Sequence, residues 1–123
     1  MKFTLEGSPD VNVIRSYGAE EIRVGERIIR SSCLVTADKV IAEWPPTSID
    51  EVQINHLELI FELSPELVLF GTGTRQRFAP ASLRAAFASR RIGLESMDLG
   101  AACRTFNILV QEQRRVAAAL FLK

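Results

Sequence analysis

Two glycines separated by one residue follow an apolar run in the middle of the chain, and they begin the most suggestive segment. The run covers residues 67–70 and has no polar alternation, as expected of a strand buried on both faces. The residues that follow it form the first candidate binding group: Gly71, Thr72, Gly73, Thr74 and Arg75. Glycine permits positive φ and close backbone approach, so exposed amides in this group could hold an anion.

The glycine pattern is not that of a known nucleotide-binding loop. It lacks the third glycine of a dinucleotide-binding motif and the Gly-Lys-Ser/Thr ending of a phosphate-binding loop. Pro80, which begins the next helical pattern, comes seven positions after Gly73. A tight structural turn and a site for a ligand or partner therefore both stay open.

A second group of polar side chains follows a short strand in the last third of the chain. Asp98 is predicted to be the N-cap of the last helix, and Arg104 and Asn107 lie one turn apart on its polar face. Such a pair could bind a carboxylate, a phosphate or a backbone carbonyl at the sheet edge. In the structural alternative Arg104 pairs with Glu95 or Asp98, and Asn107 caps the end of a strand.

No arrangement of cysteine, histidine or carboxylate residues identifies a catalytic or metal centre. Cys33 and Cys103 lie in separate apolar stretches without the spacing of a zinc site or redox dithiol, so both are predicted to be buried and reduced. His56, the only histidine, is expected to be a surface or capping residue. We predict no metal and no cofactor; enzymatic activity stays uncertain, with the balance against it.

Charge is distributed unevenly although its net value is zero. Residues 1–70 contain 6 Lys/Arg and 12 Asp/Glu, whereas residues 71–123 contain 9 and 3. The segment 75–91 has arginines and no acid: Arg75, Arg77, Arg84, Arg90 and Arg91. These arginines either form a solvated helix face with salt bridges to the acidic half, or bind an anion or an acidic partner surface. Nucleic acid is not an expected partner, because the chain is not basic overall and no aromatic residues alternate with these arginines.

Length and composition predict one compact α/β domain over residues 1–123. Hydrophobic residues make up 47% and charged residues 24%, which is typical of globular proteins. No apolar run approaches the roughly 20 residues needed to span a bilayer, so no membrane insertion is expected. The first ten residues do not resemble an export signal, and cysteines are few; both favour the cytoplasm.

The first 45 residues read as a β meander. Predicted strands cover residues 11–17, 22–24, 27–30, 33–36 and 40–44, and Gly25-Glu26 and residues 37–39 form turns. Pro45-Pro46 ends the last of these strands, because proline cannot donate to a sheet ladder.

The remainder alternates between helical and strand patterns. Capping-box spacing occurs at Ser48/Glu51 and Asn55/Glu58, and the second is the better helix start. A helix from Pro80 should close near Gly93 in a left-handed conformation. The C-terminal half therefore reads strand-helix-strand-helix-strand, with strands at 67–70, 94–97 and 116–122 in a partly parallel, mixed sheet. The last strand is expected to be covered on both faces.

Three segments carry a resemblance to a known family: ELVLFGTG, GLESMDLGAACRTFNIL and EQRRVAAALFL. They resemble the uncharacterised domain family that includes mitochondrial respiratory complex I assembly factor three and the adipogenesis-associated domain protein. The resemblance extends to the opening NVIRSYG and to Trp44-Pro45. It implies a compact α/β domain with a β-hammerhead-like element and no established catalytic reaction.

The signature carried over by this resemblance has ten positions: Gly71, Gly73, Glu95, Met97, Asp98, Ala102, Cys103, Arg104, Thr105 and Asn107. Leu99 and Phe106 stand where a threonine and a tyrosine are expected, so two hydroxyl groups are lost. The resemblance and the charge split favour a non-catalytic binding or assembly-helper domain that contacts a protein partner.

The alternative function is a small anionic-metabolite binding protein or enzyme that uses the same residues. In both cases Gly71, Gly73, Arg104 and Asn107 are predicted to converge on one side of the domain, because ligands of open α/β sheets bind where strands end. The sequence does not determine the natural ligand, the oligomeric state or whether complex I assembly applies.

Overall fold

Strand β8 (Val116–Phe121) lies at the centre of the main sheet, and all six of its residues are buried, as its apolar sequence predicted. The computed structural model describes residues 11–122; residues 1–10, on which the expectation about export rested, lie outside the described residues. The order of strands in this sheet is β5-β4-β8-β6-β7. Both β6 (Leu67–Thr72) and β7 (Gly93–Met97) run parallel to β8, whereas β4 (Cys33–Val35) is antiparallel to it. The predicted mixed sheet is confirmed.

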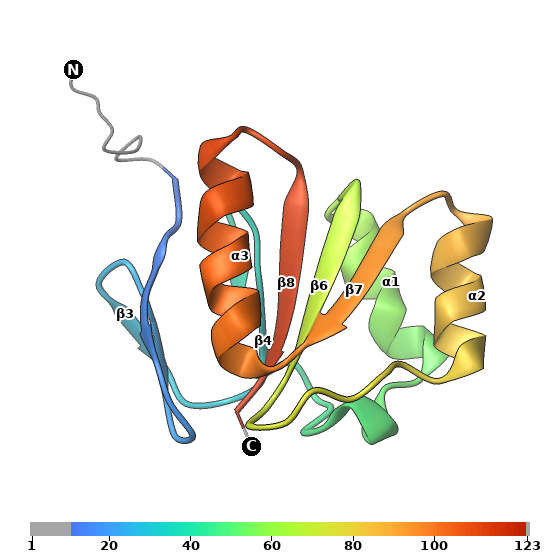
Figure 1. Ribbon diagram of the computed structural model, residues 1–123, viewed down its shortest axis with the longest axis horizontal. Helices are drawn as coiled ribbons and strands as arrows, with labels where there is room; N and C mark the ends of the chain where they lie inside the picture. The colour runs from blue at the N-terminus through green and yellow to red at the C-terminus, as the bar shows by residue number, and fades with distance from the viewer. Residues whose placement is uncertain (1–10, 123) are drawn as a thin grey trace.

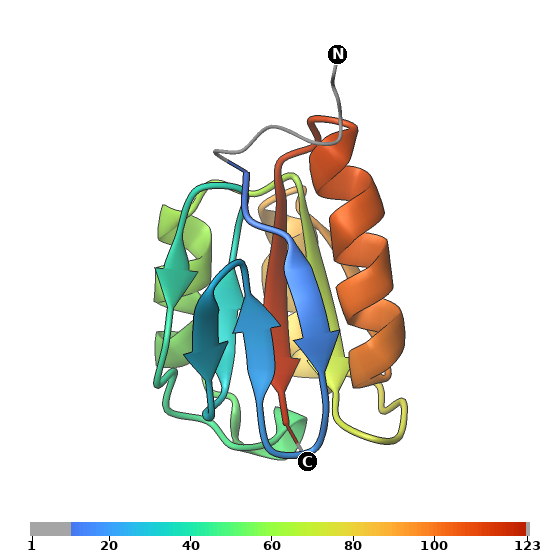
Figure 2. The same cartoon turned by 90° about the vertical axis from the view of Figure 1, so that its left-hand side faces the viewer.

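The predicted N-terminal meander forms a separate antiparallel sheet of three strands (Figure 2). Its strands are β1 (Ile14–Tyr17), β2 (Ile22–Val24) and β3 (Arg27–Ile29). Gly25 has φ 57° in the turn between β2 and β3, which is the left-handed conformation that glycine adopts without strain. One face of this sheet is apolar and buried. The predicted hairpin that follows is also present, although β5 (Val40–Ile41) is shorter than the expected 40–44.

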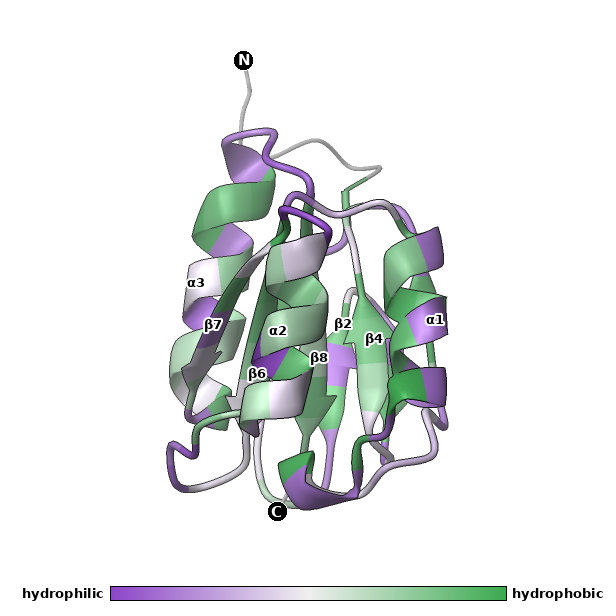
Figure 3. Cartoon of the chain, turned by 90° about the vertical axis from the view of Figure 1, so that its right-hand side faces the viewer, coloured by the Kyte–Doolittle hydropathy of each residue, from purple (hydrophilic) through white to green (hydrophobic). Residues whose placement is uncertain are grey.

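Helices cover the main sheet on both faces (Figures 1 and 3). One face packs against α1 (Ile54–Glu62) and α2 (Ala81–Ser89), and the other against α3 (Leu99–Gln111) together with the three-stranded sheet. The chain order β6, α2, β7, α3, β8 confirms the predicted strand-helix-strand-helix-strand half. None of the helices within residues 11–122 combines the length and the apolar character needed to cross a membrane.

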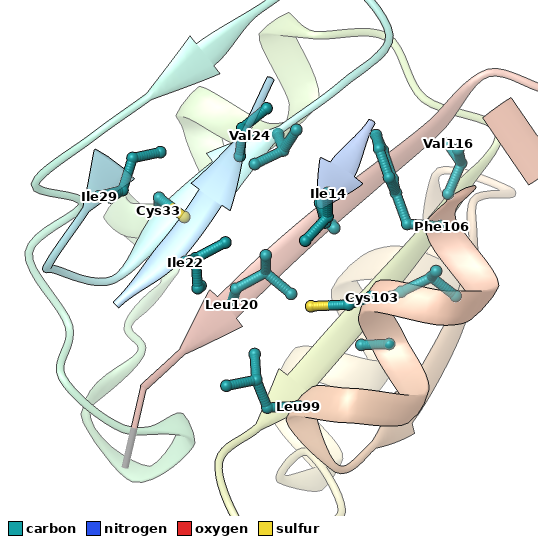
Figure 4. Packing of buried hydrophobic residues seen from close by; sticks show 14 of the residues in the cluster. Ile14, Ile22, Val24, Ile29, Cys33, Leu99, Cys103, Phe106, Val116 and Leu120 are labelled. Carbon is teal, nitrogen blue, oxygen red and sulfur yellow. The ribbon is translucent and has the colours of Figure 1, made fainter. Parts of the chain in front are cut away.

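Two hydrophobic clusters result, one on each side of the main sheet. The cluster under α3 contains both cysteines, and Figure 4 shows the Cys103 side chain directed from α3 into it. The cluster under α1 and α2 combines aliphatic residues with aromatic ones, and the Phe121 ring contacts those of Trp44 and Phe70. Leu99 and Phe106 are buried in the first cluster, so they serve packing there.

Two predicted helix ends are wrong, and one predicted cap lacks its side-chain hydrogen bond. Helix α1 is capped by Gln53 and not by Asn55. The backbone N–H of Gln53 donates a hydrogen bond of 2.9 Å to His56 Nδ1. Ser48 occupies the N-cap position of the 3-10 turn η1 (Ile49–Glu51), as its capping-box spacing predicted, but its side chain makes no capping hydrogen bond. Helix α2 ends at Ser89, before the predicted end, and Arg91 takes the left-handed conformation with φ 60° in place of Gly93. Helix ends depend on which nearby groups satisfy the free backbone N–H and C=O groups, so a sequence pattern places them less exactly than the helix itself.

Candidate functional site

Both glycines of the first candidate group lie against the start of helix α3. A Cβ added to Gly71 would be 2.9 Å from Ala102 Cβ and 3.0 Å from Leu120 Cδ2, so only glycine fits there without movement. Gly73 has φ 88°, and its carbonyl accepts a hydrogen bond of 2.7 Å from the Leu99 amide. The end of β6 and the first turn of α3 are therefore in direct contact.

Thr72 organises the loop that follows these glycines. Its buried hydroxyl donates to the Arg75 carbonyl at 2.7 Å and accepts from the Arg77 amide at 3.0 Å. Gly71, Thr72 and Gly73 are all buried, whereas Thr74 and Arg75 are exposed. Only the last two members of this group are thus accessible to a partner.

Asp98 caps helix α3, as predicted: its Oδ1 accepts a hydrogen bond of 2.8 Å from the Ala101 amide. Arg104 does not pair with Glu95 or Asp98, so that form of the structural alternative is wrong. Its Nη1 instead donates to Tyr17 Oη at 2.7 Å, on the exposed side of the helix.

Gly100 makes room for this contact. A Cβ at Gly100 would lie 2.9 Å from Tyr17 Cε1 and 3.1 Å from Arg104 Nη1. Sequence reasoning missed Tyr17 and Gly100, because Tyr17 and Arg104 are 87 positions apart. The one available signal was an aromatic residue in the NVIRSYG segment of the family resemblance.

The side-chain amide of Asn107 forms two hydrogen bonds to the backbone of strand β1. Its Oδ1 accepts from the Ile14 amide at 2.8 Å, and its Nδ2 donates to the Ile14 carbonyl at 2.9 Å. Ile14 is the first residue of β1, so this pair joins α3 to the start of the three-stranded sheet. The geometry matches the structural alternative for Asn107, while Arg104 remains exposed.

Most of the arginines between residues 75 and 91 have partners within the protein. Arg77 forms an ion pair with Asp50, and Arg84 Nε donates to the Ala79 carbonyl at 3.1 Å. The Arg90 guanidinium lies 4.1 Å from the centre of the Phe61 ring, a cation–π distance. Only Arg77 of these three forms the predicted salt bridge to the acidic half; Arg84 and Arg90 have a carbonyl and an aromatic ring as partners.

The chemistry of the cysteines is that of packed, protonated thiols. Burial raises the pKa of Cys33 and that of Cys103 to about 12. A thiol needs a lowered pKa to act as a nucleophile at neutral pH, so neither is suited to that role. Among residues 11–122, no group of three or more His, Cys, Asp or Glu is placed to hold a metal ion.

Comparison with known proteins connects this arrangement to a family. Residues 14–121 match a family model described as protein of unknown function (DUF498/DUF598). NADH dehydrogenase (ubiquinone) 1 alpha subcomplex assembly factor 3 from Danio rerio is 31% identical over 110 residues, covering 88% of this chain and 63% of that protein. The Bos taurus protein of the same name is 34% identical over 116 residues, covering 92% and 62%. The chain therefore spans less than two-thirds of these relatives.

Solved structures share the fold over nearly their whole length. The crystal structure of a Bordetella parapertussis protein has a TM-score of 0.84 at 30% identity, covering 93% of this chain and 98% of that one. The NMR structure of a Xanthomonas campestris protein has a TM-score of 0.82 at 36% identity, covering 90% and 84%.

Proposed function

Because the chain belongs to the family of proteins of unknown function DUF498/DUF598, we propose that it is a non-catalytic helper domain that contacts a protein partner during assembly of a complex. The observation that carries this proposal is the similarity to relatives named as assembly factors, which extends over about nine-tenths of the chain in Danio rerio and Bos taurus. Since the match covers less than two-thirds of the length of those proteins, their partner is not transferred with the role.

The contact surface that we propose consists of Tyr17, Gly100, Arg104 and Ile108. Tyr17 is 43% exposed and Ile108 is 59% exposed, one turn beyond Arg104 on the same helix face. Tyrosine and arginine are the residue types that most often dominate protein interfaces. This patch is called the Tyr17–Arg104 surface below.

Arg104 is the recognition residue of the Tyr17–Arg104 surface in this proposal. Its one hydrogen bond to a described side chain is to the neutral phenol of Tyr17. A guanidinium has five N–H donors in a planar fork, so donors remain for a carboxylate of the partner. The Gly73–Leu99 hydrogen bond holds the first turn of α3 in place beneath this side chain.

Affinity capture with matched arginine variants tests this proposal. The wild-type chain, Arg104→Met and Arg23→Met are immobilised in parallel, and retained proteins are quantified at several salt concentrations. Arg23 is also exposed, but it lies on β2 away from α3. We expect a protein that the wild type and Arg23→Met retain and that Arg104→Met loses. Equal retention by Arg104→Met, or no specific protein at any salt concentration, contradicts the proposal.

Thermal melting of the same variants separates the alternative function from this one. Arg104→Met should melt within a few degrees of the wild type, because it removes a single exposed hydrogen bond worth about 1 kcal/mol. A bound anion at 100 times its dissociation constant would stabilise the fold by about 2.7 kcal/mol. Stabilisation by phosphate or citrate that Arg104→Met abolishes would favour an anionic metabolite over a protein partner.

We place this activity in the cytoplasm. The support is the pair of free, buried cysteines, since a reducing compartment is where thiols persist. Fractionation of cells that express the full-length protein, followed by immunodetection, tests this location; recovery in the membrane or exported fraction would contradict it.

A further inference from the structure

A recess whose lining includes no residue of the Tyr17–Arg104 surface lies beside the turn after β1 and Leu122, the residue that follows β8. Its volume is about 750 Å³, and it opens to solvent. The walls come from the turn between β1 and β2, the residues after β3, the segment 43–47 and Leu122. A recess of several hundred cubic ångströms is the usual size of a small-molecule site.

Hydrogen bonds hold the wall of this recess in one arrangement. The Glu43 amide donates to Ser31 Oγ at 2.8 Å, and the Trp44 amide donates to the Ser32 carbonyl at 3.0 Å. Trp44 is 2% exposed, and its indole N–H donates to the His56 carbonyl at 3.3 Å. The recess is thus formed before any ligand arrives, which lowers the entropic cost of binding.

Ser32 contributes a hydroxyl group to this wall. The residue is 7% exposed, and its hydroxyl makes no hydrogen bond to any residue between 11 and 122. Its carbonyl, by contrast, accepts from both Trp44 N and Ser31 Oγ. No buried side-chain oxygen of the described residues lacks a hydrogen-bond partner, so the unbonded Ser32 oxygen is accessible to solvent and available to a ligand.

The charges that line the recess favour a cation. Glu20 and Glu43 contribute two exposed carboxylates that form no ion pair with a described residue. The one arginine in this lining, Arg30, forms an exposed ion pair with Glu21, in which Arg30 Nη2 lies 3.2 Å from Glu21 Oε1. Ala19, Pro45 and Leu122 add apolar surface. An anion would face two like charges here, whereas a cation with an apolar stem would meet complementary groups.

We propose that this recess binds a primary ammonium group on a short aliphatic stem, either as a free amine or as a lysine side chain. An ammonium has three donors, and Glu20, Glu43 and Ser32 supply three acceptors. The stem lies on the apolar part of the wall. Arg104 does not line this recess, so a test of amine binding here does not depend on the proposed function.

Titration by NMR with ligands of equal length and different charge tests this site. Pentylamine and a lysine residue capped at both ends are the cationic probes, and pentan-1-ol and pentanoate are the neutral and anionic controls. We expect pentylamine, the capped lysine or both to shift the amide signals of Ser32, Glu43 and Trp44. Binding of pentylamine alone identifies a free amine as the ligand, whereas binding of the capped lysine shows that the recess accepts a lysine side chain.

Variants of the wall provide the second readout. Glu43→Gln and Ser32→Ala should each weaken pentylamine or capped-lysine binding at least tenfold. Glu26→Gln removes an exposed carboxylate in the turn between β2 and β3, outside the recess, and should leave the affinity unchanged. Thermal melting checks that each variant is folded. Equal binding of pentan-1-ol or pentanoate, unchanged affinity in Glu43→Gln, or no shift with either cation would overturn the proposal.

Discussion

Gly71 sets the distance between helix α3 and the main sheet. The hydrogen that it carries in place of a side chain faces Ala102 of the helix and Leu120 of β8. Interiors are packed as densely as organic crystals, so a single added methyl group must displace one of these neighbours. The first candidate glycine of the sequence thus has a packing role, whereas recognition in our proposal depends on Arg104.

Substitution of Gly71 by alanine should lower the free energy of unfolding by about 1–3 kcal/mol, the usual cost of overpacking. The physical reason is the 2.9 Å approach of the new Cβ to Ala102 Cβ. Urea unfolding measures the loss. Gly18→Ala is the matched control, because no atom lies within 4 Å of the Cβ that it would add. Equal stability of the two variants would show that α3 can move to make room for the added methyl group.

Asn107 is predicted to be a stabilising residue. Asn107→Ala leaves the amide and carbonyl of Ile14 without their side-chain partner and should cost about 1–3 kcal/mol. Gln111→Ala, which changes an exposed residue on the same helix, should cost little. Chemical denaturation compares them. If Asn107→Ala lost no more stability than Gln111→Ala, Asn107 would again be a candidate binding residue.

The two buried thiols should make stability fall at high pH. Burial raises the pKa of Cys33 and Cys103 from 9.0 to about 12, so the folded state keeps their protons between those values while the unfolded state releases them. Stability from this source is present below pH 9 and is lost as the pH rises toward 12. The Cys33→Ala/Cys103→Ala double variant should lose less stability than the wild type between pH 8 and 10. Parallel losses would contradict this account.

At the scale of the elements, strand β8 and helix α3 carry most of the organisation. Strand β8 is paired with β4 on one side and β6 on the other, and it has apolar neighbours above and below. Helix α3 has one buried stripe against the sheet and one polar face, which Tyr17 and Ile14 of β1 partly cover. This sharing of α3 attaches the three-stranded sheet to the rest of the molecule.

Leu120→Ala tests the central place of β8. The side chain is fully buried, so its truncation should cost about 2–5 kcal/mol through lost burial and a cavity. Leu59→Ala, on the partly exposed side of α1, provides a control that should cost much less. Thermal or urea unfolding gives both values. A loss for Leu120→Ala below about 1 kcal/mol, half of the lower bound, would be inconsistent with a strand covered on both faces.

At the scale of the whole molecule, the two hydrophobic clusters share the strands of one sheet. Alternate residues of β6 and β8 enter opposite clusters: Leu69 and Leu120 face α3, whereas Phe70 and Phe121 face α1 and α2. Unfolding of β6 and β8 would expose apolar residues of both clusters at once. We therefore propose that residues 1–123 fold as one domain.

Unfolding should then be a single cooperative transition. Trp44 fluorescence reports on one cluster, and the accessibility of Cys103 to a thiol reagent reports on the other. The two probes should give the same midpoint in urea. Separate midpoints would show two units that unfold independently.

Local patterns in the sequence were enough to predict the elements and their order. Alternation and turn residues predicted the meander around Gly25, apolar continuity predicted the burial of β8, and Asp98 was recognised as an N-cap from the residues beside it. Each of these depends on neighbours within one turn of helix or a few residues of strand. The wrong helix start at Asn55 shows the limit of such signals, because Gln53 and His56 formed the cap instead.

Only the tertiary structure decided which side chains meet. The Arg104–Tyr17 contact and the Asn107–Ile14 pair join residues 87 and 93 positions apart, so local spacing carries no information about them. The recess around Ser32 likewise combines a turn, a strand end, a loop and the C-terminal strand. Local patterns predict which segments are strands and helices, because those patterns depend on neighbouring residues. The packing of α3 across two sheets decides that Asn107 bonds to the backbone of β1 while Arg104 stays exposed.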